Sequence, residues 1–141
     1  MNAVHRALMA HPLAPEVSRE ERSAEAECIR ACIETAESCL IGADACVEED
    51  AVAELRECLR AQQDCAALCT ATAEVLARRG FPESGGGSAV LRSLLETCRE
   101  AARVCGHACD EHAEAYEHCA VSAEAARRCE QACAELLAEE S

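Results

Sequence analysis

The sequence predicts an all-α fold, an antiparallel up-down-up-down four-helix bundle with a cysteine-lined interior. Three observations lead to this prediction. Long segments rich in Ala, Glu, Arg and Leu alternate with turn signals, no segment has the alternating pattern of a β-strand, and cysteines recur at helical spacing in all four long segments. At 141 residues, the chain is the size of one domain and can supply four helices of roughly 20–30 residues.

The chain divides into a short arm and the bundle. Residues 1–16 contain two prolines and are expected to form an irregular N-terminal arm, which leaves residues 17–141 for a four-helix metal-binding bundle. Ser18 fits the N-cap of the first bundle helix, because Glu20 and Glu21 follow it at the positive end of the helix dipole. We expect this helix to end near Val47.

Three breaks separate the remaining helices. The acidic run 48–50 precedes a second helix at about 51–79, and a glycine-rich connection at 80–88 follows it. Ser88 is expected to cap a third helix that ends near 112–115. A weakly marked break near Tyr116 leads to the last helix, at about 117–139.

The composition indicates an interior built largely from sulfur. The chain has 13 cysteines but only one Phe, one Tyr and no Trp, so aromatic side chains cannot fill the centre of a bundle. The N-terminus has no apolar stretch typical of a signal peptide, no run of 18 apolar residues occurs, and the cysteine count is odd. We therefore expect a cytoplasmic protein with reduced thiols, in which clustered cysteines bind metal.

The cysteines form one stripe on each helix. In the first bundle helix they are separated by 4, 7 and 7 residues, which places them within roughly 40° of one another around the helix. Cysteine can also serve as a small core residue, but a fold that needs only packing would use leucine. Four stripes that face one another predict a metal site made of Cys28, Cys32, Cys39, Cys46, Cys58, Cys65, Cys69, Cys98, Cys105, Cys109, Cys119, Cys129 and Cys133.

The spacing favours multiple copper(I) ions. Soft thiolates select copper(I), zinc or iron–sulfur clusters, and the last two usually use C-x2-C units in turns. This chain instead repeats C-x3-C within helices, which matches disulfide geometry poorly. Sulfur atoms one turn apart can converge on one copper(I) ion, which accepts two or three thiolates and lets them bridge to its neighbours.

Two histidines are candidate ligands beside the cysteines. His112 is expected to point inward near Cys109, and His118 precedes Cys119, at the end that holds the first and third connections. At the opposite end, the same faces carry Leu76, Leu91, Leu94 and Leu136. We therefore predict that copper enters at the His112 end and that leucines close the other.

The pattern resembles the bacterial cytosolic cysteine-rich four-helix-bundle copper storage proteins. The segments that carry the resemblance are Cys28 to Cys32, Cys65 to Cys69, Cys105-Gly-His-Ala-Cys109 with His112, and Cys129 to Cys133. The resemblance implies copper(I) stored in multinuclear thiolate clusters and often a homotetramer. Fuller members carry more cysteines, and Thr35, Gly42, Ser122 and Ala126 occupy inward positions where these could lie.

The predicted function is copper(I) storage and detoxification, with copper ions and a copper chaperone as partners. The alternatives are an iron–sulfur electron carrier and a zinc or thiol redox buffer. We expect no enzyme, because no nucleophile–base pair and no phosphate-binding glycine loop stands out. A net charge of −14 excludes nucleic acid and anionic membrane surfaces as favoured partners.

Overall fold

A computed structural model describes the chain except residues 1, 13, 79–84 and 141. Its described part is helical and contains no strand. The α-helices are α1 (Ala3–Ala10), α2 (Arg19–Val47), α3 (Arg56–Ala77), α4 (Gly85–Asp110) and α5 (Glu117–Glu140), and two short 3-10 helices are η1 (Ala14–Glu16) and η2 (Val52–Leu55).

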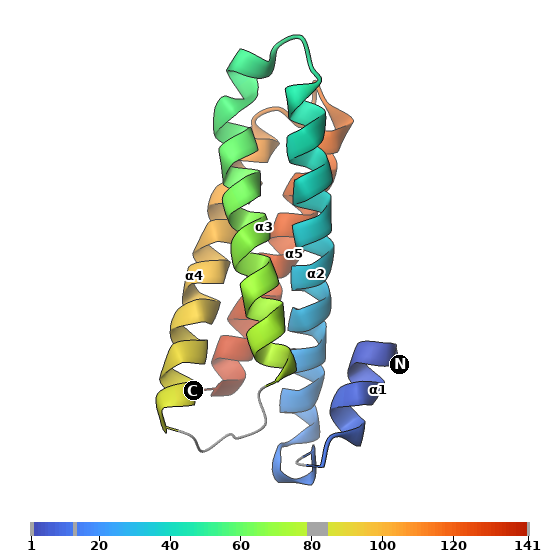
Figure 1. Cartoon of the computed structure of the whole chain (residues 1–141), viewed down its shortest axis with the longest axis vertical. Helices are drawn as coiled ribbons and strands as arrows, with labels where there is room; N and C mark the ends of the chain where they lie inside the picture. The colour runs from blue at the N-terminus through green and yellow to red at the C-terminus, as the bar shows by residue number, and fades with distance from the viewer. Residues whose placement is uncertain (1, 13, 79–84, 141) are drawn as a thin grey trace.

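The four long helices form an antiparallel bundle. Figure 1 shows α2 and α4 running in one direction and α3 and α5 in the other. Helix α2 packs against α3 and α5, and α4 packs against the same two helices, so α2 and α4 lie on a diagonal. Short connections between sequential helices favour this up-down arrangement, and the predicted four-helix bundle is confirmed.

The N-terminal segment differs from the expected irregular arm. Residues Ala3–Ala10 form helix α1, whose first turn is capped by the Asn2 side chain accepting a hydrogen bond from the His5 backbone N–H at 3.0 Å. Helix α1 lies along one end of α2 (Figure 1), where Leu8 is buried against the core. Burial of one apolar side and a polar N-cap explain the helix, despite the two prolines that follow.

The helix boundaries follow the local signals with two exceptions. Ser18 caps α2 as predicted, with its hydroxyl accepting from the Glu21 N–H at 3.0 Å. The second helix begins with a 3-10 turn, η2, before α3. Helix α4 begins at Gly85, earlier than the predicted cap at Ser88, since glycine can adopt helical dihedral angles although it favours them weakly. The rest of the expected connection, 80–84, lies outside the described residues.

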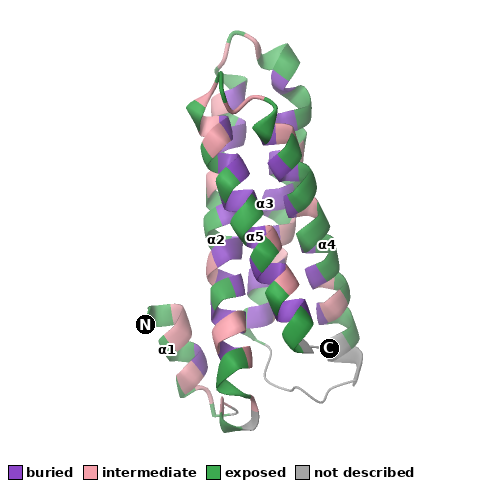
Figure 2. Cartoon of the chain, turned by 180° about the vertical axis from the view of Figure 1, so that it is seen from behind, coloured by how far each residue is buried: buried purple, intermediate pink, exposed green. Residues whose placement is uncertain are grey.

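The core consists of cysteine and alanine over most of its length, with four leucines at one end and the single buried Leu55 of η2 at the other. Figure 2 shows the buried residues lining the inner faces of the four helices. The leucines at the end near the α3–α4 connection are Leu76, Leu91, Leu95 and Leu136. Leu95 takes the place predicted for Leu94, which is only half-buried, because the inward face of α4 is turned toward Leu95 and Ala102.

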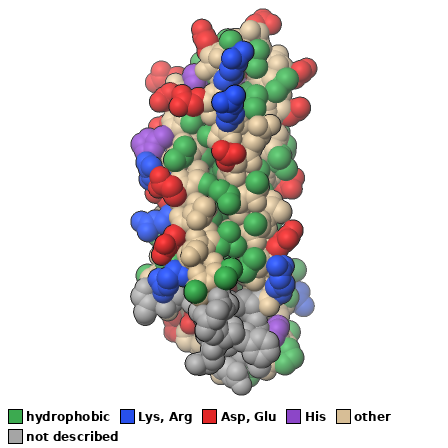
Figure 3. Space-filling view, turned by 60° about the vertical axis from the view of Figure 1, so that its left-hand side comes forward, with side chains coloured by type: hydrophobic (Ala, Val, Ile, Leu, Met, Phe, Trp, Pro, Cys, Tyr) green, Lys and Arg blue, Asp and Glu red, His purple; other side chains and the backbone are tan. Residues whose placement is uncertain are grey.

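The outer surface is mixed in polarity. On the face in Figure 3, most charged side chains lie along the edges and apolar side chains gather along the middle, with a few charged side chains toward the top of the middle. None of the described helices is long and apolar enough to cross a membrane.

Candidate metal centre

All thirteen cysteines are free thiols with side chains 0% exposed in the interior of the bundle. Their stripes are brought together because each helix buries its cysteine face against two neighbouring helices. The S···S hydrogen-bonding distances are 3.3–4.0 Å, far longer than the roughly 2.05 Å of a disulfide. The interior is therefore a row of reduced sulfur atoms near one another.

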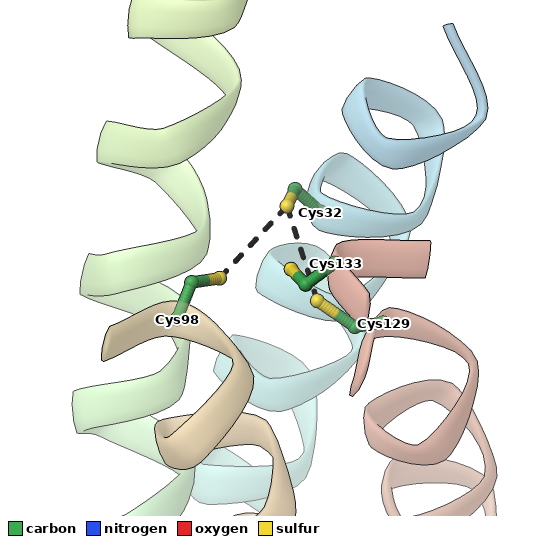
Figure 4. Close-up of side chains that lie close together, drawn as sticks. All are labelled: Cys32, Cys98, Cys129 and Cys133. Carbon is green, nitrogen blue, oxygen red and sulfur yellow. Dashed lines mark hydrogen bonds between the residues drawn. The ribbon is translucent and has the colours of Figure 1, made fainter. Parts of the chain in front are cut away.

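A deep group of four cysteines lies toward the leucine end. The Sγ atoms of Cys32, Cys98, Cys129 and Cys133, from α2, α4 and α5, all lie within 4.8 Å of one another (Figure 4). Cys32 Sγ is 4.0 Å from Cys98 Sγ and 3.9 Å from Cys129 Sγ. Cys28 extends the group through a 3.8 Å contact with Cys133. Three helices thus supply ligands to one small volume.

Helix α3 connects this deep group to a middle group. Cys69 Sγ is 3.8 Å from Cys98 Sγ and 3.6 Å from Cys129 Sγ, and it is also 3.8 Å from Cys65 Sγ. The middle group consists of Cys39, Cys65 and Cys105, whose sulfur atoms lie within 4.8 Å of one another. Since Cys69 touches both groups, it is the junction between them.

The row continues from the middle group toward the opposite end. Cys39 Sγ is 3.7 Å from Cys105 Sγ, and Cys105 Sγ is 4.0 Å from Cys109 Sγ. Cys109 Sγ is in turn 3.3 Å from Cys58 Sγ on α3. Cys105 and Cys109, which are four residues apart on one face of α4, therefore connect the cysteine of α2 to the cysteine of α3.

The end beside the α2–α3 and α4–α5 connections carries a mixed sulfur–nitrogen group. Cys46 Sγ, Cys119 Sγ and a His118 ring nitrogen lie within 4.8 Å of one another. His118 Nδ1 is 3.7 Å from Cys119 Sγ, while His118 Nε2 is 2.9 Å from a Glu49 carboxylate oxygen. A carboxylate on the outer nitrogen orients a histidine ring and makes it a better metal ligand.

The other histidines occupy different surroundings. His112 lies in the turn between α4 and α5, half-buried, and belongs to no group of three metal-binding side chains among the described residues. His107 is exposed on α4. The structure thus brings His118 to Cys46 and Cys119 and leaves His112 outside this group, in the turn at the same end of the bundle.

Sequence reasoning missed Gln62. This side chain is 0% exposed, and its Nε2 donates to Cys58 Sγ at 3.4 Å and to Cys46 Sγ at 3.6 Å. The available signal was its position, four residues after Cys58 and three before Cys65, which places it on the cysteine stripe of α3.

A model of the copper storage protein family matches residues 21–138, which is nearly the whole bundle. The chain belongs to the copper storage protein family. This assignment confirms the predicted family, its storage function and copper as the metal that it holds. It also favours copper over the iron–sulfur and zinc alternatives.

Solved structures of a relative agree with the assignment. The chain is 43% identical to the copper storage protein Ccsp from Streptomyces lividans loaded with 10 copper equivalents, over 96% of this chain and 98% of that chain, with a TM-score of 0.86. A five-copper structure from S. lividans, described as a cytosolic copper storage protein, is 47% identical over 84% and 95% of the two chains, with a TM-score of 0.78. A curated Bacillus subtilis protein, the uncharacterized cysteine-rich protein YhjQ, is 26% identical over 79% of this chain and 94% of its own length.

The crowding of thiols shifts their pKa values in this copper storage protein. Hydrogen bonding to Cys129 raises the pKa of Cys32, and hydrogen bonding to Cys105 raises the pKa of Cys39; burial adds to both. In contrast, a hydrogen bond with Cys109 lowers the pKa of Cys58 to about 6. Thiols with raised pKa values stay protonated until a metal displaces the proton, so copper binding releases protons.

We expect the reduced apo protein to lose stability as the pH rises above about 9. An unfolded cysteine ionises near the ordinary value of 9.0, whereas the folded Cys32 and Cys39 have raised pKa values. Their contribution is therefore fully present below pH 9 and is lost at higher pH, by about 1.4 kcal/mol per pH unit for each proton that the folded state retains. The chain has no lysine, so few groups other than the cysteines titrate in this range.

Urea unfolding of the anaerobic apo protein between about pH 8 and 10.5 measures this effect. The copper-loaded protein is the control, because its folded thiolates hold no protons and its stability should not fall over this range. A free energy of unfolding that stays constant or rises for the apo protein would contradict the prediction.

Proposed function

We propose that this chain holds its copper(I) ions through all thirteen cysteine thiolates, with histidine added at one end. The observation that carries the proposal is the row of buried sulfur atoms that runs through the bundle. Eleven of the thirteen sulfur atoms lie 3.3–4.0 Å from another sulfur atom, and those of Cys46 and Cys119 lie within 4.8 Å of each other. A thiolate has more than one lone pair and can bridge two soft ions, so such a row suits multinuclear copper(I) clusters. A storage role requires this capacity and no catalytic step.

We further propose that copper enters at the end that holds His112 and His118. At this end Cys46, Cys119 and His118 form a three-ligand group, and His118 is about one-fifth exposed. Four buried leucines close the opposite end of the bundle. Copper arriving at the histidine end meets a mixed N/S site before the sulfur-only interior.

We also propose that the protein acts in the cytosol. The relative from S. lividans is described as cytosolic, and a reducing cytosol keeps thiols such as these free. A copper chaperone would deliver or remove the metal.

The proposal also includes a homo-oligomer, with the tetramer as the expected form. Helix α2 exposes an apolar stripe on its outer side that supports it, made of Ile33, Leu40, Ile41 and Val47.

An anaerobic copper(I) titration of the reduced apo protein against a competing chelator tests this function. We expect tight binding up to roughly one copper ion per cysteine, because each ion shares bridging thiolates with its neighbours. Saturation at one or two ions would contradict storage in this interior. Preferential tight binding of zinc, for which the deep four-sulfur group also has a suitable ligand set, would favour the thiol-buffer alternative.

The same titration followed over time tests where copper enters. His118→Ala and His112→Ala should slow loading without lowering the final amount of copper by more than the ion held at that end. His107→Ala is the matched control, since His107 is on the exposed side of α4. Equal loading rates in all four proteins would argue against the histidine end.

A further inference from the structure

The deep group of cysteines differs from the rest of the interior in the number of ligands that meet there. Its members are Cys32, Cys98, Cys129 and Cys133, and each side chain is 0% exposed. Figure 4 shows their sulfur atoms turned toward one another, and all four lie within 4.8 Å of each other. Within the described part of the chain, the other two groups of metal-binding side chains supply three ligands each. The deep group therefore offers a complete four-sulfur set.

Four converging sulfur atoms are the ligand set of a structural zinc ion. Such an ion lies at the centre of a tetrahedron with Zn–S distances of about 2.3 Å, which places the sulfur atoms about 3.8 Å from one another. Cys32 Sγ is 3.9 Å from Cys129 Sγ and 4.0 Å from Cys98 Sγ. The sulfur–sulfur distances of the group therefore differ from those of a zinc site by about 1 Å at most. A single copper(I) ion needs only two or three of these thiolates.

Two neighbouring thiols can stabilise the charge of such a site. Four thiolates around one Zn²⁺ leave an excess of negative charge in a buried space, which requires hydrogen-bond donors around the ligands. Cys28 Sγ is 3.8 Å from Cys133 Sγ. Cys69 Sγ is 3.6 Å from Cys129 Sγ and 3.8 Å from Cys98 Sγ. Because Cys28 and Cys69 are not members of the four, each can keep its proton and donate S–H to a ligand sulfur.

We propose that the copper-free protein binds one zinc ion in the deep group and that copper(I) displaces this ion as the protein loads. Zinc binding replaces the four S–H protons, which are released to solvent. Copper(I) is softer than zinc and shares bridging thiolates, so loading breaks the four Zn–S bonds and releases Zn²⁺ without electron transfer. Until then, zinc links α2, α4 and α5. The displacement step rests on the copper storage function, whereas the zinc site does not.

Cobalt(II) is the spectroscopic probe for this site, because it adopts the tetrahedral coordination of zinc and its visible absorption bands are strong only in that geometry. Reduced apo protein is titrated with cobalt(II) under anaerobic conditions, and zinc is then added. We expect the bands of tetrahedral sulfur coordination to saturate at about one cobalt ion per chain and to disappear with about one equivalent of zinc. Weak bands typical of octahedral cobalt(II), or bands that do not saturate, would overturn the proposal.

Replacing one ligand at a time tests which residues hold the zinc. Cys98→Ser removes one sulfur atom from the deep group and should weaken zinc binding by more than about a hundredfold, beyond the usual cost of losing an outer partner. Cys133→Ser provides a second test if Cys98→Ser folds poorly. Cys39→Ser in the middle group and His118→Ala in the mixed group are the matched controls and should bind zinc as the wild type does. Equal losses in the deep-group and control variants would overturn the assignment.

Copper(I) added to the zinc-bound protein tests the displacement. We expect release of about one zinc ion per chain, counted with a zinc-sensitive dye under anaerobic conditions. Zinc retained at full copper loading would overturn this step. The copper capacity of the zinc-free apo protein is measured separately, so a chain that stores copper but binds no zinc contradicts this inference alone. A chain that binds zinc but only one or two copper ions contradicts storage and supports the zinc site.

Discussion

Replacing Cys69 by alanine is expected to remove more than one copper ion from the fully loaded protein. Cys69 Sγ lies within 3.8 Å of sulfur atoms on three other cysteines, Cys65, Cys98 and Cys129, and joins the deep group to the middle group. A bridging thiolate contributes to several copper sites at once, so its loss leaves each of them short of a ligand. Anaerobic titration with a competing chelator, with the bound copper counted per chain, measures the change.

The matched control for this prediction is Thr35→Ala. Thr35 is buried on the inward face of α2 but carries no sulfur, so this variant should keep the full number of copper ions. Circular dichroism of both apo variants establishes that each bundle is folded. A Cys69→Ala protein that loses one copper ion or none would show that the deep and middle groups fill independently of each other.

Replacing Glu25 by alanine is expected to destabilise the protein by about 3–5 kcal/mol, because it leaves a buried arginine without its partner. Arg22 Nη1 is 2.9 Å from Glu25 Oε1 one turn along α2, and both side chains are only 2% exposed. The Arg22 Nε has no hydrogen-bond partner, so the guanidinium has little other compensation for its lost hydration. Urea unfolding of the reduced apo protein measures the loss.

Two further variants separate pairing from packing. Arg22→Met combined with Glu25→Leu removes both charges and should recover most of the stability lost in the single variant, as apolar replacements of buried ion pairs often do. Glu100→Ala breaks an exposed bridge to Arg103 of similar spacing and should cost far less, because water screens that pair. Similar losses in Glu25→Ala and Glu100→Ala would contradict the role assigned to burial.

The helix pattern and the cysteine stripes could be predicted because they are local properties. A residue's direction around a helix follows from 100° per position, so the intervals of 4 and 7 place every cysteine on an inward face before any neighbouring helix is known. The Ser18 cap and the breaks between helices are likewise read from a few adjacent residues. The four-helix bundle with a buried sulfur interior follows from these signals and is what the structure has.

One detail was wrong and another stays a prediction, because both depend on where a helix ends or how its neighbours pack. The third bundle helix was expected to reach residues 112–115, whereas α4 ends at Asp110 and His112 lies half-buried in the turn that follows, so the inward direction of its side chain stays a prediction. Leu95 replaces Leu94 in the core because packing against α3 and α5 sets the centre of the buried face of α4. The angular positions of residues around one helix do not show where that helix ends or which part of its surface its neighbours cover.

By itself, the sequence determined that each helix would present sulfur to a common interior and that soft metal ions would be held there. Only the tertiary structure decided which sulfur atoms from different helices become neighbours, such as Cys69 with Cys98 and Cys129. It also decided that His118 meets Cys46 and that Gln62 fills the space above Gly42. The physical reason is that helix periodicity fixes directions around one axis, whereas contacts between helices depend on their relative shifts, which the connections and the packed side chains set together.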